Sequence, residues 1–174
     1  NMQTPSDDTT DKQPVLLITG GKITVNADGD GLDSNGNLRV EGGDITVNGP
    51  SNGGNGALDI GTENGGAGVI AGGTLIALGA SSMAENFGST STQCAFLVTM
   101  NSFGAGETIT ITDSQGTVLY TGVTVKSANS VVFSSADLVV GETYTVTIGS
   151  SSATVTQSST VVGNSNGFGG FGRH

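Results

Sequence analysis

The sequence predicts an all-β protein in which a short parallel β-helix precedes a small antiparallel β-sandwich-like module. Glycine-rich segments recur in the first half, and strictly alternating apolar and polar residues follow in the second half. Nowhere do apolar residues keep helical spacing for longer than about one turn; the best candidate, residues 81–87, is short. Thirty glycines without a collagen-like period fit a turn-rich β fold better than disorder.

Residues 1–13 form a polar leader, and residues 14–79 contain the repeat. Segments 18–26, 40–48 and 70–78 align, with Gly-Gly pairs starting at positions 20, 42 and 72, at spacings of 22 and 30 residues. A period of about 22 residues with short strands is typical of a parallel β-helix coil, built from a strand, a Gly-Gly corner, a second strand and a loop. Glycine permits the tight bend of such a corner.

Side-chain alternation predicts which residues of the second coil face its interior. The inward set is apolar: Leu38, Val40, Ile45 and Val47. The outward set is polar: Arg39, Glu41, Asp44 and Thr46. Stacking of coils places Lys22 beside Asp44, and the extra residues of the second coil fall in the loop 49–66.

Residues 80–157 show antiparallel signals. The alternating segment 108–112, the turn 113–116 and the segment 117–120 predict a hairpin, and segments 130–133, 143–148 and 153–155 predict further strands. Cys94, the single cysteine, begins an apolar strand and is expected to be a small core residue. This module would cover one end of the β-helix, and residues 158–174 form a Gly/Ser/Phe-rich tail.

The first coil has little sequence before it to cover its strand edges. A solenoid cannot bury its own ends, so an open coil exposes apolar core and unpaired backbone groups. The chain is therefore expected to be a fragment of a longer helix, or to have another molecule on that end.

The charge of the chain limits its partners. Fifteen acidic residues against five basic ones give a formal net charge of −10, which repels nucleic acid and anionic lipid and attracts cations. Solubility alone is the alternative explanation of this acidity. No apolar run is long enough for a membrane span.

The sharpest chemical motif is the loop 28–36, in which three aspartates and three glycines fall within nine residues. Calcium prefers six to eight oxygen ligands, which such a loop can supply. Repeat alignment stacks Asp33 on Asp59, and a divalent cation would relieve their repulsion. The predicted calcium ligands are Asp28, Asp30, Asp33, Asn55, Asp59 and Glu63. The alternative is a hydrogen-bonded turn with solvated carboxylates.

Other sites fit the sequence less well. The loop is not an EF-hand, because its sixth position is Asp33 and its twelfth is Arg39. His174 is the only histidine, so a Ser-His or Cys-His pair has no base and zinc has no usual ligand set. Paired carboxylates cleave glycosidic bonds in some β-helical enzymes, but here they lie in a loop expected to hold metal. We therefore expect no enzyme activity.

The segment 20–36, together with the segments 48–50, 55–59, 73–77 and 91–94, resembles a bacterial family. The chain is similar over residues 15–150 to the secreted "carbohydrate-binding domain-containing" β-helix proteins of clostridia and their relatives. This resemblance implies a right-handed parallel β-helix, a secreted or cell-surface location and binding of acidic polysaccharide such as polygalacturonate. It also implies that Asp30, Asp33 and Asp59 are calcium ligands.

Two functions follow as expectations. The first is an extracellular calcium-binding protein that binds acidic polysaccharide without catalysis. The second is a structural subunit that assembles head to tail into an extracellular filament through its open coil and its tails.

Overall fold

The computed structural model describes residues 13–163, so residues 1–12 of the predicted leader (1–13) and residues 164–174 of the predicted tail (158–174) lie outside the described part. It confirms that the protein is all-β. The described residues form fifteen strands and two single-turn 3-10 helices, η1 (Thr62–Asn64) and η2 (Ser81–Met83). Within residues 13–163 we find no helix that has both the length and the apolar character needed to cross a bilayer.

The repeat forms three stacks of parallel strands. One sheet contains β1 (Val15–Ile18), β4 (Asn37–Val40) and β7 (Gly68–Ile70). A second stack contains β2 (Lys22–Asn26), β5 (Asp44–Asn48) and β8 (Thr74–Gly79). A third pairs β3 (Leu32–Asp33) with β6 (Leu58–Asp59). The register follows the repeat alignment, because Lys22 pairs with Asp44 and Asp33 with Asp59, as predicted.

The Gly-Gly corners stack on one another. The second glycine of each pair has a positive φ, at 91° for Gly21, 106° for Gly43 and 84° for Gly73. A Cβ added to Gly73 would lie 2.7 Å from the carbonyl oxygen of Gly43. All three positions therefore favour glycine for the left-handed backbone, and Gly73 also needs it for the close approach of the previous coil.

The second stack belongs to a six-stranded sheet with the order β15-β9-β12-β8-β5-β2. Its remaining strands are β9 (Ala95–Phe103), β12 (Ala128–Ser134) and β15 (Val161–Val162). Strand β12 pairs antiparallel with both β8 and β9, while β15 pairs parallel with β9. The sheet is therefore mixed. It joins strands from both sides of the boundary that the sequence predicted between residues 79 and 80.

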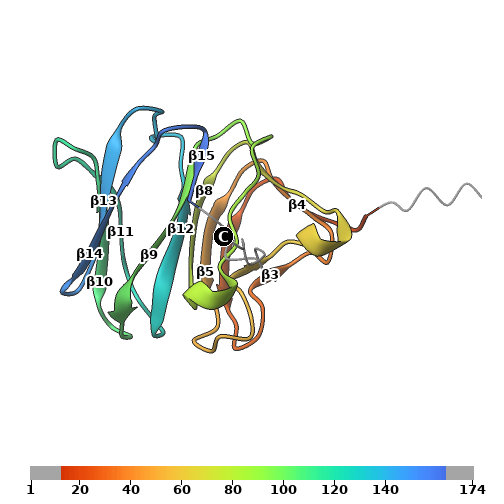
Figure 1. Ribbon diagram of the computed structural model, residues 1–174, viewed down its shortest axis with the longest axis horizontal. Helices are drawn as coiled ribbons and strands as arrows, with labels where there is room; N and C mark the ends of the chain where they lie inside the picture. Colours follow the sequence, from red (N-terminus) through yellow and green to blue (C-terminus); the bar gives the residue numbers. More distant parts are fainter. Residues whose placement is uncertain (1–12, 164–174) are drawn as a thin grey trace, which may run out of the picture.

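A four-stranded antiparallel sheet with the order β11-β10-β13-β14 forms the other layer. It contains β10 (Thr108–Thr112), β11 (Val118–Val123), β13 (Thr143–Ile148) and β14 (Ser151–Thr156). The predicted hairpin of β10 and β11 is confirmed. Figure 1 shows this sheet on the left, the six-stranded sheet in the middle and the stacked coils on the right.

Strands β8, β9 and β12 of the middle sheet bury residues on both of its faces. Leu75 and Ala77 of β8 pack among the coil residues, whereas Ile76 and Leu78 of the same strand pack against the four-stranded sheet. The predicted inward residues of the second coil are almost wholly buried: Leu38, Val40, Ile45 and Val47. Two apolar cores thus share one sheet.

Three local features differ from the prediction. The loop 49–66 contains β6 and η1, because Leu58 pairs with Leu32 and carries the register into that loop. The candidate helix 81–87 has only the single turn η2. Cys94 lies just before β9 and is only half-buried, so it packs against the core between the two sheets rather than within it.

The first coil has open strand edges. Strands β1, β2 and β3 each end their sheet, and none has a partner on its outer side among residues 13–163. Val15 and Leu17 of β1 are 58% and 52% exposed. The exposed edge expected from the sequence is therefore present in the described part of the chain.

Candidate metal centre

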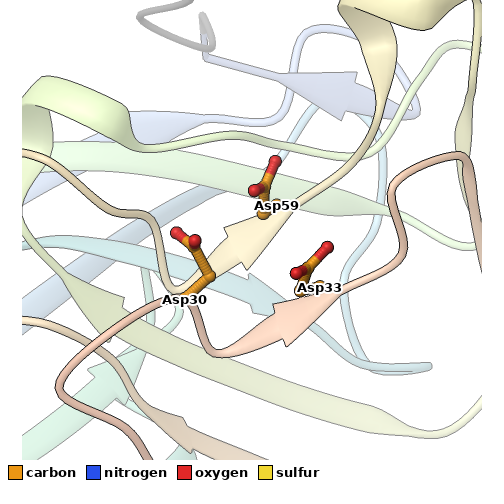
Figure 2. A group of neighbouring side chains, drawn as sticks. All are labelled: Asp30, Asp33 and Asp59. Carbon is orange, nitrogen blue, oxygen red and sulfur yellow. The ribbon is translucent and has the colours of Figure 1, made fainter.

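Three aspartate side chains converge where the third stack begins. Leu32 and Leu58 point into the core, so the next residue on each strand, Asp33 or Asp59, points outward, and pairing aligns the two. Asp30 joins them from the turn before β3 (Figure 2). One carboxylate oxygen from each aspartate lies within 4.8 Å of the other two. We call this group the aspartate triad.

Hydrogen bonds and glycine fix the shape of the triad. The Gly56 N–H donates to Asp30 Oδ1 at 2.8 Å, and the Asn35 N–H donates to Asp33 Oδ1 at 3.1 Å. A Cβ on Gly31 would lie 2.2 Å from the Ala57 carbonyl oxygen, so only glycine lets the loop pass so close to the next coil. The carboxylates of Asp30 and Asp33 are therefore held by bonds that leave oxygens for another ligand.

Electrostatics disfavours the triad when all three groups are ionised. Burial raises the pKa of Asp59, and the charges of Asp30, Asp33 and Glu63 raise it further. The ion pairs found in residues 13–163 are Arg39–Glu41 and Lys126–Asp28, and neither supplies a cation to the triad. A bound cation would remove this repulsion.

The other predicted ligands lie differently. Asp28 is fully exposed and 2.6 Å from Lys126 Nζ, which lowers the Asp28 pKa through a hydrogen bond and its charge, so Asp28 is not part of the triad. Glu63 is exposed in η1, where its carboxylate accepts a hydrogen bond from Asn64, and lies outside the triad. The Asn55 amide nitrogen donates to Asp30 Oδ2 at 3.3 Å, so Asn55 borders the triad.

Sequence reasoning missed Glu85. This half-buried carboxylate accepts hydrogen bonds from the Ile60 N–H at 2.6 Å and from Thr62 Oγ1 at 3.2 Å. Burial raises its pKa and the charges of Asp59 and Glu63 add to the rise, while these two hydrogen bonds lower it. Glu85 lies beyond the repeat, in a segment without a period or motif, so nothing in the sequence indicated its proximity to Asp59.

The donors fit a hard divalent cation. The triad offers carboxylate oxygens alone, with no histidine or cysteine in the group. Oxygen-only sets suit calcium, magnesium or manganese, and calcium tolerates irregular geometry best. Comparison with protein-family models, with curated proteins and with solved structures finds no match to this chain.

Proposed function

We propose that this chain is a non-catalytic calcium-binding protein of the extracellular space or cell surface, which binds acidic polysaccharide. The carrying observation is the aspartate triad, whose carboxylates from Asp30, Asp33 and Asp59 lie within 4.8 Å of one another without a neutralising side chain. In this proposal residues 14–79 form a short right-handed parallel β-helix. The in-register parallel stacks at the repeat spacing support it.

Acidic rather than neutral sugar follows from the chemistry of the surface. A chain with a net charge of −10 repels a polyanion unless a divalent cation bridges the two. Neutral sugars usually stack on exposed aromatic rings, but the chain has no tryptophan, Tyr144 is buried and Tyr120 is only partly exposed. A calcium ion shared by the triad and by sugar carboxylates needs no such ring.

Calcium titration followed by polysaccharide binding tests the proposal. The parent protein should bind calcium and gain thermal stability from it, and it should then bind polygalacturonate but not cellulose. A chelator should abolish the gain in stability and the binding of polygalacturonate. Asp33→Asn should weaken calcium and polymer binding together, whereas Asp44→Asn, which removes an exposed strand carboxylate outside the triad, should change neither. A melting temperature that does not change with calcium would contradict the metal site. Equal binding to polygalacturonate and cellulose would contradict the proposed acidic-sugar ligand.

The open edges of β1, β2 and β3 favour a second candidate, a subunit of an extracellular filament. A heterologous contact that does not close on itself gives an open-ended fibre. Sedimentation and electron microscopy with calcium present test this candidate. The protein should form fibres at high concentration, and deletion of residues 1–12 or 164–174 should prevent them without unfolding the monomer. A chain that stays monomeric would refute it.

A further inference from the structure

A pocket of about 520 Å³ opens between the turn of the β10–β11 hairpin and the turn that follows β12. Its apolar walls come from Val118, Leu119 and Val139, and Tyr144 closes its floor. Tyr144 is only 1% exposed, and its hydroxyl oxygen accepts the Val139 N–H at 2.8 Å, which fixes one wall. Val118 and Val139 are both 55% exposed, so this apolar surface faces solvent.

Three carboxylates line the same pocket: Asp113, Asp137 and Glu142. The hydrogen bonds they accept come from neutral groups, namely the Gln115 and Thr117 N–H groups, the Ser135 hydroxyl and the Ser114 hydroxyl. Neither ion pair of the described chain involves them. An occupant that matches this pocket has an apolar body and a positive charge.

The chain itself carries a segment of this chemistry. Residues 167–173 read Gly-Phe-Gly-Gly-Phe-Gly-Arg, which places two aromatic rings and a cation on a glycine-rich stretch. We propose that residues 167–173 dock in this pocket of the same chain, with Arg173 among the carboxylates and a phenylalanine ring against the valines. Docking would cover Val118 and Val139 and would neutralise part of a surface that otherwise carries uncompensated negative charge.

The tail is long enough to reach. Val161 pairs with Ala95, and Ala95 pairs with Ser134, so two strand spacings separate β15 from the end of β12. Adding the residues from Val161 to Gly163 and from Ser134 to Asp137, the path from Gly163 to the pocket is at most about 27 Å. Ten residues from Gly163 to Arg173 can span about 33–36 Å. A tethered segment also has a high effective concentration, which favours docking in the same chain.

Nuclear magnetic resonance of the full chain and of a variant lacking residues 164–174 tests the proposal, with chelator present so that calcium plays no part. Methyl signals of Val118, Leu119 and Val139 should shift on truncation, and those of Val15 and Leu17, exposed on the distant β1, should not. Arg173→Gln should reproduce part of the shift, whereas Arg39→Gln should not. Raising salt from about 0.01 to about 1 M should reduce the difference, because screening shortens the Debye length from about 30 to about 3 Å.

The outcomes separate docking within one chain from its alternatives. Shifts that do not change on dilution support the proposal. Identical spectra for the full and truncated chains would overturn it, as would shifts that vanish on dilution, which indicate docking between molecules. An equal effect of Arg39→Gln would reduce the finding to a general effect of charge and would also overturn it.

Discussion

At the scale of single residues, Asp59 carries the strongest evidence for a function that involves a cation. Its carboxyl group lies beside Asp30 and Asp33, and both burial and those charges raise its pKa above the ordinary value of 3.8. A carboxyl with a raised pKa in the folded state favours folding below its unfolded pKa and loses that contribution as pH rises through the folded value. The contribution of Asp59 to the stability of the metal-free protein should therefore fall as pH rises above about 4. Glu85, whose pKa is also raised, acts in the same direction.

We predict that Asp59→Asn stabilises the metal-free protein at pH 7 and weakens its response to calcium. The amide cannot ionise, so it removes the repulsion and flattens the fall in stability above about pH 4. The parent protein should gain about 2.7 kcal/mol when calcium is 100-fold above its Kd, and the variant should gain much less at the same concentration. Urea titrations between pH 4 and 8, with calcium and with chelator, measure both effects.

Asp44→Asn is the matched control for this prediction, because Asp44 is an exposed aspartate on β5 outside the triad. It should leave both the pH dependence and the calcium response close to those of the parent. If Asp59→Asn destabilised the metal-free protein at pH 7, the carboxylate would be a structural group rather than a repelled one, and the electrostatic argument for a cation would fail.

At the scale of elements, the Gly-Gly corners determine how closely the coils stack. Gly20 has an ordinary backbone and open space around it, and Gly21 has a positive φ with open space. Gly73 has a positive φ and close contacts with Gly42 and Gly43 of the previous coil. Substitution at these three positions can therefore distinguish the free-energy cost of a left-handed backbone from the cost of a clash with the previous coil.

We predict that alanine substitutions become more costly in the order Gly20, Gly21, Gly73. Gly20→Ala should change the free energy of unfolding by less than about 0.5 kcal/mol, and Gly21→Ala should cost about 1–2 kcal/mol for its left-handed backbone. Gly73→Ala should cost more, since its Cβ would lie 2.7 Å from the Gly43 oxygen. Chemical denaturation of the three variants measures this order. Equal costs at Gly21 and Gly73 would mean that corner stacking contributes nothing.

The sequence predicted those features that the repeat encodes locally. The alignment of Gly31-Leu32-Asp33 with Ala57-Leu58-Asp59 was enough to place two aspartates side by side, because side-chain alternation and coil stacking leave one register. Contacts between distant segments left no such signal. Lys126 forms an ion pair with Asp28, which lies 98 residues away in the sequence and outside the triad. Glu85, in a loop without a repeat, accepts a hydrogen bond from the Ile60 N–H.

The pairing of β12 with β8 could not be predicted for the same reason. The segment 130–133 was expected to be a strand, but any open edge would have satisfied its backbone groups. The pairing with β8 depends on packing on both faces of β12. Val132 packs in the coil core, and Val131 and Phe133 pack in the core between the sheets. Tertiary packing determines this pairing, and the local pattern of apolar and polar residues does not encode it.

At the scale of the whole molecule, the shared sheet joins two cores. Leu97 of β9 belongs to the second half of the sequence but packs in the coil core, while Phe96 beside it packs in the core between the sheets. Removing either layer would expose one buried face of the six-stranded sheet to water. The coils and the antiparallel strands should therefore depend on each other for stability, although the sequence changes character between residues 79 and 80.

We predict that residues 14–162 unfold in a single cooperative transition. Backbone amides of Val47 in β5 of the six-stranded sheet and of Val146 in β13 of the four-stranded sheet should exchange with the same opening free energy in native-state hydrogen exchange. Leu97→Ala should lower both values equally, by about 2–5 kcal/mol, because the cavity it leaves in the coil core weakens the sheet that both layers need. The amide of Leu16, on the open edge strand β1, is the internal control and should exchange through local opening at lower free energy. If Val146 kept its protection in Leu97→Ala while Val47 lost it, the four-stranded sheet would be stable on its own, and the change of pattern at residue 80 would mark a boundary between folding units.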